Sequence, residues 1–238
     1  MSTHILVVEH EPACPPAHLG TWLVEAGAEL EVCRPWAGDE LPGLAGYDAF
    51  VILGGSMGAN DDATHPWLTT VKERVREAAD AGVPTLGVCL GHQLVAVALG
   101  GTVEPCPGGQ QVGLYDLGWR PEAKGDALVS GLSPTMRGIQ WNSDLVTGLP
   151  DGAVVLAATA EGELQVVRFA KTVWGVQPHP EADEPMVRSW AAGDRDDHLE
   201  RGIDQDAVLA DIDAARPELD EAWRPLATGL VALVGAQR

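Results

Sequence analysis

Short apolar runs alternate with segments of helical periodicity from the N-terminus to residue 101. Short apolar runs bounded by turn residues are typical of buried strands, and apolar residues spaced three and four apart indicate amphipathic helices. The pattern predicts strands at 4–10, 30–35, 47–55 and 84–90, and helices at 16–26, 66–82 and 91–101. Because such alternation is typical of α/β folds, we expect an open, mostly parallel sheet with helices on both faces.

The hydrophobic pattern changes after Gly101. Glycine and proline turns now separate strand-like segments, which lie at 102–106, 110–119, 135–144, 153–160 and 164–181. The remaining segment, 182–238, is acidic and is predicted to be helical. The whole chain, 1–238, is therefore predicted to be a single domain with 182–238 as a helical C-terminal extension packed on it.

An apolar stripe favours the packing of this extension on a core. Its members recur at spacings of four, three, four and three residues: Leu219, Trp223, Leu226, Leu230 and Leu233. A stripe of this kind is typical of a helix whose apolar face covers other elements. Pro225 interrupts the stripe and is expected to kink the helix.

Charge and composition narrow the possible partners and the compartment. The formal charge of −20 disfavours nucleic acid and anionic membranes as partners. We interpret the acidity as a trait of solubility or salt adaptation. No run approaches the roughly 20 apolar residues of a membrane helix, and "MSTHILVVEH" lacks the basic start of a signal peptide. The cysteines have no metal-binding spacing, so we expect a cytoplasmic protein without a metal ion or a cofactor.

The stretch "GVCLG" (87–91) places a cysteine between a predicted strand and a predicted helix. Small residues two positions before and after a nucleophile permit the sharp turn of a nucleophile elbow. The N-terminus of the following helix favours a thiolate. The same residues also fit a buried structural cysteine with incidental glycines. Three other cysteines lack this context and are interpreted as structural: Cys14, Cys33 and Cys106.

A histidine that could act as a base lies in "VQPHPE" (176–181). His179 and Glu181 are two residues apart, so they share a face if the segment is extended, and the neighbouring prolines favour that geometry. A carboxylate beside an imidazole fixes its tautomer and stabilises the imidazolium. A surface turn with ordinary polar residues remains an alternative.

The glycine-rich segment "LGGSMGAND" (53–61) follows a predicted strand. Next to the elbow, its Gly55 N–H could point at the oxyanion that the Leu90 N–H also serves. The spacing matches neither a phosphate-binding P-loop nor a dinucleotide fingerprint. An ordinary turn is the alternative interpretation.

These motifs together resemble the class I glutamine amidotransferase family. The resemblance rests on "GVCLGHQ" (87–93), "GGSMGAND" (54–61) and "QPHPE" (177–181), and it covers residues 45–182. "HPW" followed by a helix, and "GHQLVAVALGG", are further similar to stand-alone amidotransferases related to the glutaminase domain of GMP synthase. The resemblance implies a flavodoxin-like amidotransferase fold.

The resemblance also implies a role for each residue of the motifs. Cys89, His179 and Glu181 match the catalytic triad, and Gly55 and Leu90 match the donors of the oxyanion hole. The triad would hydrolyse the side-chain amide of L-glutamine through a cysteine thioester, which gives glutamate and ammonia.

Glutamine binding is implied for two further segments. Gln93 matches a position that contacts the substrate. "QWNSD" (140–144), with Asn142, Ser143 and Asp144, matches a segment whose backbone grips the α-amino and carboxylate groups. The family usually has a histidine where this chain has Asn142. Because the segment works largely through its backbone, we expect glutamine binding to survive this departure.

The sequence does not identify the molecule that accepts the ammonia. The family usually delivers it to a synthetase, so the expected partner is a separate synthetase that accepts the ammonia. One alternative is a γ-glutamyl hydrolase or peptidase that uses the same triad. Another is an inactive, glutamine-sensing regulatory subunit.

Overall fold

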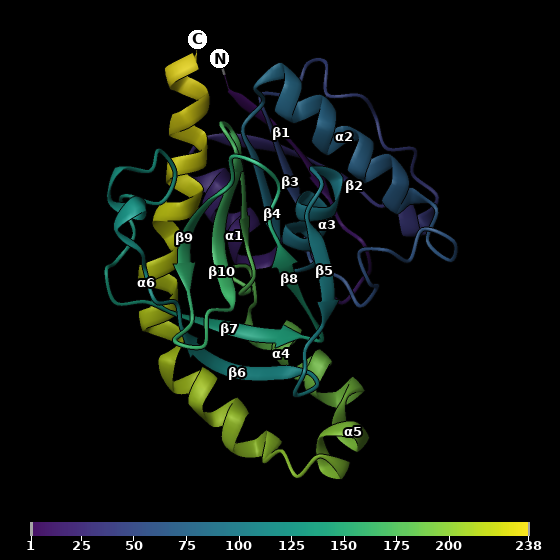
Figure 1. Ribbon diagram of the computed structural model, residues 1–238, viewed down its shortest axis with the longest axis vertical. Helices are drawn as coiled ribbons and strands as arrows, with labels where there is room; N and C mark the ends of the chain where they lie inside the picture. The colour runs from purple at the N-terminus through teal and green to yellow at the C-terminus, as the bar shows by residue number, and fades with distance from the viewer. Residues whose placement is uncertain (1, 238) are drawn as a thin grey trace.

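The computed structural model describes residues 2–237 and has a central sheet flanked by helices (Figure 1). The strands are β1 Thr3–Val8, β2 Ala28–Cys33, β3 Ala49–Ile52, β4 Thr85–Val88, β5 Thr102–Pro105, β6 Gln111–Asp116, β7 Arg137–Asn142, β8 Asp144–Gly148, β9 Val154–Ala158, β10 Leu164–Ala170 and β11 Val173–Val176. The helices are α1 Ala17–Glu25, α2 Trp67–Ala81, α3 Leu90–Ala98, α4 Glu184–Gly193, α5 Arg195–Glu200 and α6 Gln205–Gln237, with short 3₁₀ turns at Pro35–Ala37 and Pro121–Gly125.

The central sheet has the strand order β2-β1-β3-β4-β11-β10-β9. Neighbours from β2 to β11 run parallel, and β10 and β9 add an antiparallel edge. The predicted open, mostly parallel α/β sheet, flavodoxin-like in class, is therefore confirmed. Ligand sites of such sheets lie at the carboxyl ends of the strands.

The sheet is covered on both faces because its strands are apolar on both sides. Along β1, Ile5 and Val7 belong to one hydrophobic cluster, which includes residues of α1, α4 and α6. Leu6 and Val8 belong to a second cluster, with α2 and α3. Continuous apolar strands are what a parallel sheet between two helical layers requires.

The C-terminal helix α6 contributes to the first of these cores. Four members of the predicted stripe are buried and Leu233 is partly buried against them. The helix continues past both Pro217 and Pro225, and Figure 1 shows that it curves along its length. No helix among residues 2–237 is long and apolar enough to cross a membrane.

Two small sheets, β5–β8 and β6–β7, complete the architecture. Figure 1 shows β6 and β7 lying across one end of the main sheet, near α4 and α5. The end of β7 supplies Trp141 and Asn142, so this sheet places side chains beside the carboxyl ends of the parallel strands.

Several predicted boundaries differ from the structure. The segment predicted as one strand at 164–181 is a hairpin, because the chain reverses at residues 171–172 between β10 and β11. After that hairpin the chain bends at 177–178 and turns at 180–181, with His179 between them, so the segment is not the regular extended continuation that the prolines suggested. The predicted strand at 47–55 is limited to β3, because its glycines leave the sheet to form a loop.

Candidate active site

Cys89 lies in a strained turn between β4 and α3. Its backbone has φ 50° and ψ −107°, a region that residues with a side chain rarely adopt. Non-glycine residues in such conformations cluster at functional sites, where the surrounding structure holds them. The predicted strand–cysteine–helix junction is therefore present with the geometry of an elbow.

The glycines around Cys89 are required by close packing of the backbone. A Cβ on Gly87 would lie 2.4 Å from the Gly91 carbonyl oxygen. A Cβ on Gly91 would lie 2.1 Å from the carbonyl oxygen of Ile52, at the end of β3. Real Cβ atoms do not approach oxygen this closely, so any side chain at these positions would force the backbone apart.

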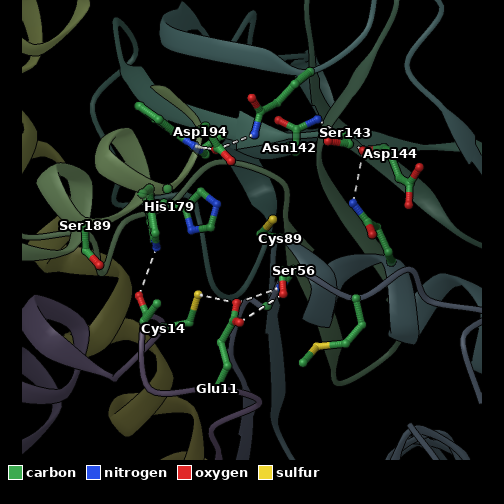
Figure 2. Close-up of a pocket in the computed structure, with 18 residues that line it drawn as sticks. Glu11, Cys14, Ser56, Cys89, Asn142, Ser143, Asp144, His179, Ser189 and Asp194 are labelled. Carbon is green, nitrogen blue, oxygen red and sulfur yellow. Dashed lines mark hydrogen bonds between the residues drawn. The ribbon is translucent and has the colours of Figure 1, made fainter. Parts of the chain in front are cut away.

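The turn brings Cys89 to the same cavity as His179 (Figure 2). Gly54 packs between them: a Cβ there would lie 3.1 Å from His179 Cε1 and 3.7 Å from Cys89 Cβ. His179 Nδ1 is 2.7 Å from Glu181 Oε1, and both side chains are almost fully buried. The three residues of the predicted triad therefore converge, although ninety positions separate Cys89 from His179.

The charges around His179 determine its protonation. Burial lowers its pKa, but the negative charges of Cys89 and Glu181 outweigh this effect and raise the pKa well above 6.5. An imidazolium is therefore favoured beside the sulfur. Nδ1 is bonded to Glu181, and the Cys89 side chain lies close enough to help raise the pKa, so the imidazole is placed to exchange a proton with the sulfur.

The glycine-rich loop forms another side of the cavity through Gly55, Ser56 and Met57. Glu11, which follows β1, accepts hydrogen bonds from the Ser56 backbone N–H at 2.7 Å and from its hydroxyl at 2.9 Å (Figure 2). Within the described part of the chain, the Gly55 and Leu90 amides donate no hydrogen bond. Both predicted oxyanion donors are thus unused.

Gln93 and Asn142 hold the bend that follows β7. Gln93 Nε2 donates to the Asp144 carbonyl at 3.0 Å, and Asn142 Nδ2 donates to the same oxygen at 3.1 Å. These two residues line the cavity together with Ser143 and Asp144. Burial, and secondarily the charge of Asp61, raise the pKa of the Asp144 carboxyl.

A second wall comes from β7 and from α4 with its C-terminal end. Trp190 packs against His179 with ring centroids 4.7 Å apart, and against Trp141 at 5.9 Å. Trp141 Nε1 donates to Asp194 Oδ2 at 2.8 Å, and Gln110 Nε2 donates to the same oxygen at 3.0 Å. Ser189 and Gly193 complete this wall.

The cavity between these walls has a volume of about 370 Å³, within the range of about 300–1,000 Å³ that is usual for small-molecule sites. It is lined by Cys89, His179 and all the predicted glutamine-binding residues. In the described part of the chain, no group of three or more His, Cys, Asp or Glu side chains is arranged to hold a metal ion.

One cysteine interpreted as structural lies in the cavity. Cys14 lines it, and its thiol donates to Glu11 Oε1 at 3.4 Å. Burial, followed by the charge of Glu11, raises the pKa of Cys14, so this group stays a thiol and does not compete with Cys89 as a nucleophile. No spacing along the chain places Cys14 here, because α1 and β1 bring it in through tertiary packing.

Several further residues of the cavity were not predicted as site residues, among them Glu11, Trp190 and Asp194. Glu11 had one available signal: it is an acidic residue just beyond the carboxyl end of an apolar strand, where sites of α/β sheets lie. Trp190 and Asp194 had none, because they belong to an ordinary amphipathic helix and its end.

Comparisons with known proteins agree with this geometry. The family model described as glutamine amidotransferase class-I matches residues 19–185. One of the subunits of the glutamine-hydrolysing GMP synthase from Saccharolobus solfataricus is 28% identical over 75% of this chain and 82% of its own length. Gamma-glutamyl peptidase 4 from Arabidopsis thaliana is 30% identical over 60% of this chain and 57% of its own length.

Solved structures share the fold over nearly the whole chain. A glutamine amidotransferase from Thermotoga maritima superimposes with a TM-score of 0.85 at 23% identity, and covers 97% of this chain and 99% of its own. One from Methylobacillus flagellatus gives 0.86 at 24% identity, with 98% and 95% covered. The C-terminal helices are therefore part of a fold that occurs in other proteins.

Proposed function

Because this chain belongs to the class I glutamine amidotransferase family, we propose that it hydrolyses the side-chain amide of L-glutamine through a thioester on Cys89. The observation that carries the proposal is the meeting of Cys89, on its strained elbow, with His179 in one cavity. Glu181 bonds the far side of the same imidazole at 2.7 Å. Nucleophile, base and orienting carboxylate are the elements that nucleophilic amide hydrolysis needs.

The reaction proceeds in two steps. The Cys89 sulfur attacks the amide carbon of glutamine, the C–N bond breaks, and His179 gives its proton to the departing ammonia. Water, deprotonated by His179, then attacks the thioester and releases glutamate. The raised pKa of His179 suits the first step, because the proton must be present when the leaving group departs.

The backbone stabilises the oxyanion that forms in each step. The N–H groups of Gly55 and Leu90 have no other acceptor among the described groups, and preorganised donors of this kind typically contribute about 10²-fold or more to the rate. Glu11 fixes the loop by bonding the next residue, Ser56, at two points. We assign Glu11 as a positioning residue for this loop.

Glutamine itself is held at the bend after β7. The Asn142–Asp144 backbone grips the α-amino and carboxylate groups, and Gln93 supports that bend through the Asp144 carbonyl. Asn142 makes a second bond to the same carbonyl. This bond is why we expect the bend to keep its shape although the family usually has histidine at this position.

The ammonia acceptor is proposed to be a separate synthetase chain. The relative from Saccharolobus solfataricus is named as one of the subunits of GMP synthase, and this name denotes a part of an assembly. We also propose a cytoplasmic location, which fits the four cysteines of the chain, all of them free thiols.

A γ-glutamyl peptidase or hydrolase is the second candidate. It is supported by the relative from Arabidopsis thaliana that carries the name gamma-glutamyl peptidase. It is also supported by the second wall of Trp141, Trp190 and Asp194, which extends the cavity beyond His179. An inactive glutamine sensor is less well supported, because Cys89 and His179 meet at one cavity and Glu181 bonds the imidazole.

Glutaminase activity of Cys89→Ala tests the proposal. We expect the variant to lose hydrolysis by about 10⁴-fold or more while its thermal unfolding stays like the wild type. Glutamate release would be measured with and without cell extract, since a partner can align the oxyanion loop. Retained activity in the variant would show that Cys89 is not the nucleophile.

A further inference from the structure

We propose that Trp141, Trp190 and Asp194 form a subsite for the leaving group, one that selects γ-glutamyl amides whose leaving amine carries a second positive charge. A γ-glutamyl diamine is the simplest substrate of this class. The inference rests on the proposed function, since it assumes attack by Cys89 on a γ-glutamyl amide. It extends that function from free glutamine to a defined class of substituted amides.

The position of this wall follows from the direction of proton transfer. The departing amine must take its proton from His179, so its nitrogen lies beside the imidazole. Any group attached to that nitrogen then lies on the His179 side of the cavity. Trp190 lies directly against that imidazole, at 4.7 Å between centroids. Figure 2 shows Asp194 and Ser189 on the His179 side of Cys89, whereas Ser143 and Asp144 lie on the other side. The glutamyl and leaving-group ends therefore face different walls.

The chemistry of the wall favours a cation with an apolar body. Two indole rings 5.9 Å apart provide apolar surface and negatively polarised faces, which attract organic cations. Among the described residues that line the cavity there is no lysine or arginine, whereas Glu11, Asp144 and Asp194 are acidic. An anionic group beside Asp194 would be repelled by that carboxylate.

Asp194 is held in place but not neutralised. Its Oδ2 atom accepts from Trp141 and Gln110, both uncharged donors. Within residues 2–237 it has no ion pair with a lysine, arginine or histidine. Gln110 is fixed in turn by His198, and His198 by Gln205. This chain of bonds orients the carboxylate toward the cavity and leaves its negative charge available to a ligand.

A second observation also points to a ligand at this place. His179 Nε2 is buried and without a hydrogen-bond partner among the described groups, and it belongs to the cavity lining. This N–H is on the side of Cys89, whose charge helps to raise the His179 pKa, and in the reaction it delivers its proton to the nitrogen of the departing amine. The unused donor and the unneutralised carboxylate mark the two ends of the space that the leaving amine would fill.

The test compares two amides that differ only at the distal end. γ-Glutamylputrescine ends in an ammonium group, and γ-glutamylpentylamine has a methyl group in its place. We expect wild-type kcat/KM to favour the first by about tenfold, since a partly buried carboxylate attracts a cation at contact distance more strongly than an exposed one does. The preference should shrink between about 0.01 M and about 1 M salt because salt screens the attraction.

Asp194→Asn keeps the acceptor oxygen for Trp141 and Gln110 but removes the charge. In this variant the ratio of the two kcat/KM values should fall to about one. Asp196→Asn, an equal change of charge at an exposed neighbouring position, should keep the wild-type ratio. The ratio within each variant is the readout, so a general loss of activity does not mimic the result.

The outcomes separate the subsite from the function on which it rests. Equal hydrolysis of the two amides by the wild type, or a preference that survives in Asp194→Asn, would overturn the subsite and leave Cys89 chemistry intact. If the wild type hydrolyses neither amide nor glutamine, the proposed function fails and the subsite with it. Calorimetric binding of both amides to Cys89→Ala should show the same preference without chemistry, and equal binding would also overturn the subsite.

Discussion

The two walls of the cavity are built in different ways. The first wall, which carries Cys89, Gly55 and His179, comes from the loops at the carboxyl ends of adjacent parallel strands, and its backbone is held by close contacts. The second wall, which carries Trp141, Trp190 and Asp194, comes from β7 and from α4 with its C-terminal end, and is held by side-chain hydrogen bonds. The first wall is rigid at the backbone level, whereas the second depends on replaceable side chains.

The family match does not follow the division into two walls, because it also contains Trp141 of the second wall. It covers residues 19–185 and so includes the first wall, but it ends as α4 begins. Ser189, Trp190 and Asp194 all lie beyond it. The first wall carries the proposed nucleophile and base, whereas we propose that the second wall contacts only the leaving group. Changes in the first wall should therefore affect every substrate, and changes in the second should affect only the choice among them.

After Cys89→Ala, the largest effect is expected from Glu181→Gln in the first wall. The amide keeps the shape of the side chain but loses the charge that stabilises the His179 imidazolium. By analogy with other triads, kcat should fall by about 10³- to 10⁴-fold. The loss should be equal for glutamine and for both γ-glutamyl amides, measured as steady-state rates. A loss confined to one substrate would break the comparison between the walls.

The pH profile of the same variant sharpens this prediction. Burial lowers the pKa of His179, and the charges of Cys89 and Glu181 raise it above 6.5 in net effect. Removal of one of these charges lowers the pKa, so the imidazolium is lost at a lower pH. The basic limb of kcat/KM should therefore move to lower pH in Glu181→Gln. An unchanged basic limb would show that Glu181 does not act on the imidazole charge.

A smaller but still general effect is expected from Gly91→Ala. The new Cβ would lie 2.1 Å from the Ile52 carbonyl oxygen, so α3 must move away from β3. We expect a loss of stability of about 1–3 kcal/mol, as for other overpacked sites, and a drop in rate of about 10²-fold because the Leu90 amide moves. Thermal unfolding and steady-state rates for all three substrates measure both effects.

Gly125→Ala is the matched control, because a Cβ there meets no atom within 4 Å. It should keep both the wild-type stability and the wild-type rates. If Gly91→Ala behaved like this control, the close contact at the elbow would not be needed for the first wall.

Much of the first wall could be predicted from the sequence because its causes are local. The glycines at 87 and 91 lie where the backbone packs too closely for any side chain. This requirement can be recognised in the five-residue motif 87–91. The alternation of apolar runs and helical segments then predicts the sheet edge to which the elbow belongs. The prolines around His179 led to a wrong expectation of extended backbone, because a turn brings Glu181 to the imidazole instead.

The second wall could not be predicted because its causes are tertiary. Trp190 and Asp194 reach the cavity only because α4 packs on the sheet and β7 crosses its end, and neither event leaves a local pattern. The place of Cys14 in the cavity was not predicted for the same reason. Helix α6 was predicted from its apolar stripe. The stripe shows only that one face of α6 is covered, and it does not show that α4, earlier in the same segment, borders a cavity.

The smallest effect is expected from Trp141→Phe, which leaves an aromatic ring but removes the N–H that donates to Asp194 at 2.8 Å. Because Gln110 still bonds the carboxylate at 3.0 Å, the charge stays and only its orientation loosens. The preference for the γ-glutamyl diamine should fall by about two- to fivefold. This is a smaller effect than the complete loss of a hydrogen bond to a charged group would have.

Trp36→Phe serves as the control, since the indole of the exposed Trp36 also donates to a carboxylate, that of the buried Glu9, and neither residue lines the cavity. It should leave the preference unchanged. A fall in the glutamine rate that equals the fall for the diamine would place Trp141 among the groups that every substrate needs. The second wall would then consist of α4 and its end alone, and β7 would belong to the first wall, because only the helix would remain specific to the leaving group.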